Sequence, residues 1–181
     1  MTTLALHDTD GKIERRDPLN IEDAVIKTDK QFMDSPEMEK IAEKVRKDKN
    51  IELGPAMVWM TLVYPNISKS KPAKTKKTSK EFRHHTGYDY MLQVSGELWD
   101  MLDDKTKYFL IWEELLKLDP TFKTKEQHWV MKLRKPNYSN FYEILDNEGH
   151  EEARRLHETI QATASSLYDL DPKQEDQISL F

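Results

Sequence analysis

A short apolar run at residues 56–63, AMVWMTLV, limits the possible folds of this chain more than any other feature. The run is rich in strand-forming residues, and Tyr64-Pro65-Asn66 follows it as a turn signal. We therefore predict a buried strand. Residues 88–95 and 127–134 alternate apolar and polar side chains, which predicts two further strands.

Three segments have helical spacing of apolar residues: 36–48, 105–118 and 150–167. Ser35 is expected to cap the first, and Asp103 or Asp104 the second, after residues 96–102 lead into a turn. A short helix is predicted between Asn137 and Gly149, with Asn137 as its cap. The order of elements predicts an α+β fold.

Residues 1–35 mix charged residues, Asp and Thr without a sustained period, so we predict a flexible arm with one weak helical turn near residues 21–26. The folded domain is expected at residues 36–167. Residues 168–181 are acidic and contain proline, which predicts a flexible tail with an apolar tip.

The composition excludes several classes of protein. No apolar stretch approaches the roughly 20 residues of a membrane span, and the first residues lack the pattern of a signal peptide. The chain has no cysteine, so any metal would need His, Asp or Glu, and a reducing cytoplasm is the expected compartment. A net charge of -5 argues against a generally basic nucleic-acid binder.

The middle of the chain, residues 56–149, resembles the putative phage metallopeptidase family, a zincin-like group found in bacteriophages and prophages. The resemblance rests on the segments GYDYMLQVSGELWDML and NFYEILDNEG and on their order and spacing. Its framing residues are Gly87, Tyr88, Asp89, Gly96, Trp99, Phe141 and Gly149. The resemblance implies a small zincin-like mixed sheet with a central motif helix, flanked by N- and C-terminal helices.

Members of the family carry HELxH on that helix, where two histidines one turn apart bind Zn²⁺ and the glutamate handles the proton of the attacking water. Here the corresponding residues are Glu113-Glu114-Leu115-Leu116-Lys117. Glu114 matches the general base, while Glu113 and Lys117 stand at the two histidine positions. The third ligand position falls on Pro136 or Asn137.

These substitutions predict a domain that keeps the scaffold and has lost zinc chemistry, with no metal and no cofactor. The ammonium of Lys117 would lie where the family motif binds the zinc ion. We expect Lys117 to pair with Glu113 at i, i+4 spacing. The alternative is an ordinary solvated helix face with a surface ion pair. His150 and His157 lie about 10 Å apart along one helix, which is long for joint coordination of one ion. His84, His85 and His128 are expected at or near the surface.

Residues 177–181, QISLF, resemble the peptide by which proteins bind the bacterial DNA sliding clamp. An extended segment would place Leu180 and Phe181 in an apolar cleft, with Ile178 in a secondary hollow and Ser179 between them. Gln177 can donate and accept hydrogen bonds at the rim. The alternative is a hydrophobic terminus that folds back onto the domain.

The segment from residue 69 to 83 is strongly basic and has almost no apolar anchor, which favours a solvated loop. Contact with DNA that passes through the clamp is the alternative. The candidate DNA contacts are Lys69, Lys71, Lys74, Lys76, Lys77 and Lys80.

Together these features predict a phage or prophage protein that binds the host sliding clamp, carries an inactive metallopeptidase-like domain and modulates or inhibits host replication or repair. One alternative is an active zinc metallopeptidase tethered at the replication fork. Another is a counter-defence protein whose domain traps an immune factor.

Overall fold

The computed structural model describes residues 6–7, 13–14, 30–68, 70–136 and 141–168. Its centre is a four-stranded mixed sheet in the order β3-β4-β6-β5. β4 and β6 are parallel, and the outer strands β3 and β5 are antiparallel to their neighbours. The strands are β3 (Gln31–Asp34), β4 (Val58–Tyr64), β5 (Ala73–Lys77) and β6 (Tyr90–Ser95). The α+β prediction is confirmed.

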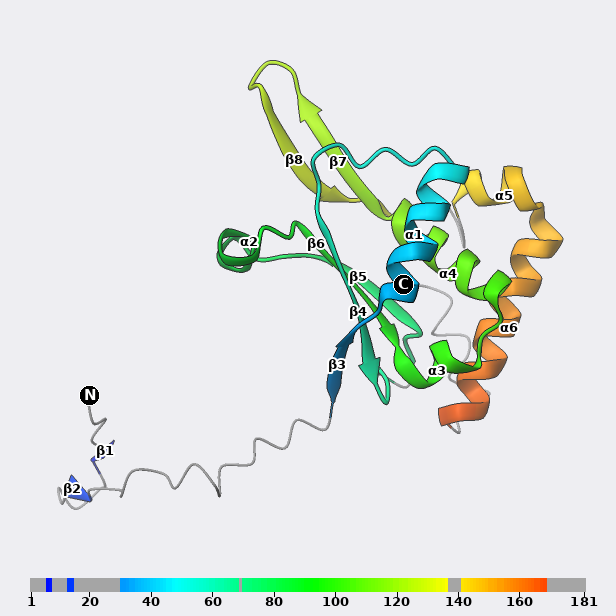
Figure 1. Ribbon diagram of the computed structural model, residues 1–181, viewed down its shortest axis with the longest axis horizontal. Helices are drawn as coiled ribbons and strands as arrows, with labels where there is room; N and C mark the ends of the chain where they lie inside the picture. Colours follow the sequence, from blue (N-terminus) through cyan, green and yellow to red (C-terminus); the bar gives the residue numbers. More distant parts are fainter. Residues whose placement is uncertain (1–5, 8–12, 15–29, 69, 137–140, 169–181) are drawn as a thin grey trace.

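Helices gather on one side of this sheet (Figure 1). They are α1 (Pro36–Asp48), α3 (Gly96–Met101), α4 (Asp104–Leu116), α5 (Tyr142–Glu148) and α6 (His150–Tyr168). A separate helix, α2 (Lys80–Thr86), lies at one end of the sheet. The hairpin of β7 (Leu118–Lys123) and β8 (His128–Leu133) projects from the body, and β1 (Leu6–His7) pairs with β2 (Ile13–Glu14). No helix among the described residues is long and apolar enough to cross a membrane.

The capping residues explain where the two central helices begin. The Ser35 hydroxyl accepts a hydrogen bond from Met38 N (3.2 Å), and the Asp103 carboxylate accepts one from Thr106 N (2.8 Å). α4 is largely buried, so its apolar residues surround it and do not form one stripe. The core forms where α4, α1 and α6 meet the even-numbered side chains of β4 and β6, such as Leu62 and Leu92.

The helices predicted at 36–48, 105–118 and 150–167 are α1, α4 and α6, and the strands predicted at 56–63 and 88–95 are β4 and β6. The strand predicted at 127–134 is β8, which pairs with β7 and not with the main sheet. β7 was not predicted, because Pro120 was interpreted only as the end of a helix. Pro120 is tolerated in β7 because this two-stranded hairpin leaves one side of each strand without a partner.

Two sequence predictions are wrong. Residues 69–83 are not a loop, because β5 and the beginning of α2 lie there, with Ser79 capping α2 through a bond from Phe82 N (3.1 Å). Within the segment 96–102, predicted only to lead into a turn, residues Gly96–Met101 form helix α3. Strand β3, within the segment predicted as an arm, was also not foreseen. The proposed turn at 21–26 and the cap Asn137 lie outside the described residues.

Candidate functional site

Helix α4 ends in the segment Glu113-Glu114-Leu115-Leu116-Lys117, in which Lys117 is the C-cap. The helix lies against β5 on one side and near α6 on another, so side chains from both elements reach its last turn. The result is a polar cluster inside an apolar surround. We call it the α4 cluster: Thr75, Glu113, Glu114, Lys117 and His157.

Glu114 is the most enclosed member, with 2% of its surface exposed. Its Oε2 accepts a hydrogen bond from Thr75 Oγ1 of β5 (2.6 Å), and its Oε1 accepts one from Lys117 Nζ (2.6 Å). Both carboxylate oxygens therefore have a partner within the protein. A buried carboxylate held in this way is fixed in position and compensated in charge.

Glu113 lies one residue back and is half-buried. Its Oε2 is 3.6 Å from His157 Nε2 of α6, and its Oε1 is 3.9 Å from Lys117 Nζ. Burial raises the pKa of Glu113, and the negative charge of Glu114 adds to this, although His157 and Lys117 oppose it. Uptake of a proton at Glu113 is consequently easier than at an exposed glutamate.

Lys117 was expected to pair with Glu113, but its short contact is with Glu114. Burial acts to lower the pKa of Lys117, and the carboxylates of Glu114 and Glu113, with the hydrogen bond to Glu114, outweigh it and raise the pKa. The ammonium is thus held in its charged form. The alternative of an ordinary surface ion pair does not fit Glu114, whose carboxylate is buried.

The donors of the α4 cluster do not suit Zn²⁺. Zinc takes lone pairs from three or four thiolate, imidazole or carboxylate groups. Here a protonated amine lies against Glu114, and a charged ammonium has no lone pair to give. No group of three His, Asp or Glu with metal-binding geometry occurs in the described ranges. Pro136 is half-buried, and its side chain has no donor atom; Asn137 lies outside the described residues.

Sequence reasoning missed Thr75 and His157 as members of the cluster. Thr75 was placed in a loop, although its neighbours Lys74 and Lys76 alternate with it as they would on a strand. His157 was considered only as a metal partner of His150. Its spacing from Leu156 and Ile160 places it beside the buried stripe of α6, where its ring meets Phe109 edge-on at 5.2 Å between centroids.

The other histidines lie elsewhere. His84 and His85 are exposed on α2 and contact each other edge-on at 5.2 Å. His128 is exposed on β8, with Nε2 at 3.4 Å from Glu126 Oε2. His150 begins α6 and is exposed.

The basic residues divide between two elements and a turn. Lys74, Lys76 and Lys77 are on β5, Lys80 begins α2, and Lys71 precedes β5. Lys69 and the whole of residues 177–181 lie outside the described residues, so their predicted contacts stay predictions.

The sequence model of the putative phage metallopeptidase family matches residues 30–168, which is more than half of the chain. The chain therefore belongs to this family. The match includes β3 and α1 as well as the segment that carried the resemblance. No curated protein and no solved structure matches the chain.

The residues that framed the family resemblance have structural roles. Gly87 ends α2 in the left-handed region (φ 79°), and the buried Asp89 accepts from Met57 N (3.0 Å) and pairs with Arg83 (2.6 Å). A Cβ on Gly96 would lie 2.5 Å from the Tyr64 ring, so this position requires glycine. Two others are buried aromatics: Trp99, whose Nε1 donates to Glu37 (2.9 Å), and Phe141.

Proposed function

We propose that this member of the phage metallopeptidase family is a catalytically inactive scaffold that binds the bacterial DNA sliding clamp through residues 177–181 in the host cytoplasm. In this proposal it modulates or inhibits host replication or repair by occupying the clamp. The two parts of the proposal rest on different residues, and each has its own test.

Loss of zinc chemistry is supported above all by the 2.6 Å contact between Lys117 Nζ and Glu114 Oε1. In the family motif, the glutamate at the position of Glu114 must take a proton from water. Here one of its oxygens holds an ammonium and the other holds the Thr75 hydroxyl. A proton taken from water would therefore compete with the ammonium and the hydroxyl for the charge of this carboxylate, which makes Glu114 a weaker base.

A reconstruction experiment tests whether Glu113 and Lys117 occupy the ligand positions. The double variant Glu113→His with Lys117→His places two imidazoles one turn apart on α4, with His157 of α6 beside the first. We expect the variant to bind about one Zn²⁺ per chain by metal analysis, and the wild type none. Zinc bound stoichiometrically by the wild type, with peptide cleavage abolished by Glu114→Gln, would establish the active peptidase instead.

Clamp binding is supported by the sequence Gln177-Ile178-Ser179-Leu180-Phe181, which has the residue types of the clamp-binding peptide in their usual order. An extended peptide of this kind buries two apolar side chains in a preformed cleft and hydrogen-bonds at its rim. A short peptide that must become ordered on binding is expected to reach a Kd in the micromolar range.

The test is calorimetric titration of the full chain into a purified bacterial sliding clamp. Replacing both Leu180 and Phe181 by Ala is expected to abolish binding. A variant with residues 177–181 scrambled is the matched control, because it keeps the composition and loses the order. Equal binding by the wild type and the double alanine variant would refute this part of the proposal.

A further inference from the structure

The sheet has a second face, opposite the core, and its side chains follow from the strand register. Trp59 of β4, Met91 of β6 and Lys76 of β5 are paired across adjacent strands and so project on the same side. Thr61, Gln93 and Lys74 form the next row in the same way. We call these six residues the open face, because α1, α3, α4 and α6 gather on the other side of the sheet (Figure 1).

The open face contains a hollow of about 150 Å³. Its lining combines two amines, an aromatic ring, an amide and two aliphatic side chains. In the same order, these belong to Lys30 and Lys74, Phe32, Gln93, and Val63 and Ile67. The hollow is smaller than the roughly 300–1,000 Å³ of pockets that enclose a drug-sized molecule, so it suits one unit of a longer ligand. Phe32 is 59% exposed at its rim.

One polar group on this face is buried without a partner. The Thr61 hydroxyl, in a residue 1% exposed, has no hydrogen bond. Beside it, Gln93 is 6% exposed and lines the hollow, and its amide makes no hydrogen bond to a described residue. Buried polar groups are nearly always paired in folded proteins. An amide that can both donate and accept, at the floor of an open hollow, is suited to the edge of a nucleobase.

Aromatic rings stand next to the same face. The Trp59 ring stacks with Phe82 of α2 at 5.5 Å and with Tyr88 at 6.1 Å between centroids, and both pairs are within 23° of parallel. The Trp59 Nε1 donates to Asp34 (3.0 Å), which fixes the indole. Phe82 and Tyr88 are half-buried, so part of each residue is exposed to solvent. Sequence analysis could not foresee this stack, because its three rings come from separate segments.

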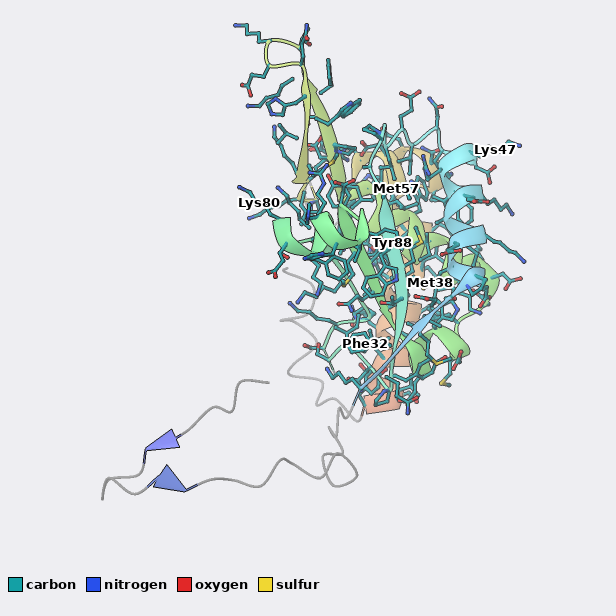
Figure 2. All side chains as sticks on the ribbon, turned by 60° about the vertical axis from the view of Figure 1, so that its left-hand side comes forward. Phe32, Met38, Lys47, Met57, Lys80 and Tyr88 are labelled. Atoms are coloured by element: carbon teal, nitrogen blue, oxygen red, sulfur yellow. The ribbon has the colours of Figure 1, made fainter. Side chains whose placement is uncertain are left out.

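The charge around the open face is positive. Lys74 and Lys76 of β5 project from this face, Lys30 lines the hollow and Lys80 begins the neighbouring α2, against the one acid that the register places beside Thr61, Asp34 of β3. In Figure 2, Lys80 lies at the left of the folded part and Lys47 of α1 at the right, with Phe32 and Tyr88 between them. The overall charge of -5 therefore hides a local basic surface.

We propose that the open face binds single-stranded DNA. Lys74 and Lys76 contact phosphates, a base enters the hollow against Phe32 and Gln93, and the stack of Phe82, Trp59 and Tyr88 supports a neighbouring base. Cations beside exposed aromatic rings on a sheet are the combination by which single strands are held. A duplex keeps its base faces stacked and hidden, so it could use the lysines but not the rings or the hollow.

The choice of DNA over RNA rests on the proposed function, which brings the chain to replicating DNA. The binding itself does not depend on the clamp, so it is measured with the full chain alone. Fluorescence anisotropy of a labelled 20-mer of thymidylate gives the affinity at low and moderate salt. We expect a micromolar Kd at low salt, weaker binding to the matching duplex, and a log K that falls with log salt by about 0.7 for each phosphate contact.

Charge reversal identifies the surface. Lys74→Glu with Lys76→Glu is expected to weaken binding by at least tenfold and to reduce the salt slope. The matched control is Lys40→Glu with Lys47→Glu, which reverses two exposed lysines of α1 and should leave the affinity unchanged within twofold. An equal loss in both variants would refute a specific site and leave only general electrostatic attraction.

Gln93→Leu separates a ligand contact from a structural role. Leucine removes an unpartnered amide, so the thermal midpoint should rise or stay constant. Binding should nevertheless weaken several-fold, because the base loses its hydrogen bonds. Tyr88→Ala should weaken binding about tenfold through lost stacking.

Three results would overturn the proposal: no anisotropy change at low salt, duplex bound as tightly as the single strand, or polyglutamate of equal charge competing as well as DNA. A single-stranded RNA that binds more tightly than DNA would overturn the choice of DNA. The Leu180→Ala, Phe181→Ala variant should bind the single strand like the wild type. A failure of clamp binding can therefore be distinguished from a failure of single-stranded DNA binding.

Discussion

Two threonines on opposite faces of the central sheet differ in whether their hydroxyl group has a hydrogen-bond partner. On the helix-covered face, Thr75 donates its hydroxyl hydrogen to Glu114, whose other oxygen holds Lys117. On the open face, the Thr61 hydroxyl is buried and has no partner among the described residues. A polar group that is satisfied within the protein stabilises the fold, whereas one left without a partner costs stability and is retained where something else can satisfy it.

This difference indicates which face can still act on another molecule. The α4 cluster contains the residues that the family resemblance assigns to the metal site, and its charges are compensated internally. The open face has amines and aromatic rings near a hollow, and one buried hydroxyl without a partner. The cluster should therefore respond to substitution chiefly through stability, and the open face chiefly through binding.

The largest expected effect comes from breaking the ion pair in the α4 cluster. Lys117→Met keeps most of the aliphatic chain and leaves Glu114 buried without its countercharge. We expect a loss of about 3 kcal/mol in the free energy of unfolding, measured by urea denaturation. Lys47→Met on the exposed side of α1 should change it by less than about 0.5 kcal/mol. A loss as small as the control's would mean that water compensates Glu114 equally well.

A second variant shows whether Glu114 is the cause. Glu114→Gln combined with Lys117→Met removes the buried charge together with its partner. The double variant should be more stable than Lys117→Met alone, because no uncompensated carboxylate remains. If both are equally unstable, Lys117 contributes by packing and not by charge.

Much of the fold could be predicted from sequence, because α1, α6 and β6 have a local apolar period, β4 is a continuous apolar run, and α4 is an apolar segment that begins at the cap Asp103. β5 and α2 could not, because lysines and threonines on an edge strand resemble a solvated loop, and the pairing of β5 with β6 decides its structure. For the same reason the α4 cluster was only half predicted. Glu113, Glu114 and Lys117 are close in sequence, but Thr75 and His157 join them only through the tertiary fold.

Thr75 and Thr61 provide the next comparison, because they lie on opposite faces of one sheet. Thr75→Val removes a hydrogen bond to a buried carboxylate and should cost about 2 kcal/mol of unfolding free energy. The same substitution at Thr61 removes an unpartnered hydroxyl.

We therefore expect Thr61→Val to stabilise the chain by about 1 kcal/mol, a rise of about 2–4 °C in thermal midpoint for a chain of this size. The two variants are chemically identical changes, so opposite signs would isolate the effect of the partner. Destabilisation by Thr61→Val would indicate that the hydroxyl is satisfied in solution and would weaken the case for a ligand on the open face.

The smallest expected effect is a change in pH dependence at Glu113. Its pKa in the folded chain is raised above the ordinary 4.5, chiefly by burial, so ionisation favours the unfolded chain. The stability due to this group is complete below about pH 4.5 and is lost as the pH rises through the raised pKa. Glu113→Gln cannot ionise, and its thermal midpoint relative to the wild type should therefore improve as the pH rises from 4 to 8.

Glu37 of α1 provides a control of the opposite sign. Its hydrogen bonds from Lys107 and Trp99 lower its pKa, so its contribution to stability is present above the ordinary 4.5 and is lost as the pH falls. Glu37→Gln should be less stable than the wild type at pH 7, and the difference should shrink toward pH 3. If Glu113→Gln followed this second trend, His157 and Lys117 would outweigh burial at Glu113, and the α4 cluster would be held together by its charges in spite of being enclosed.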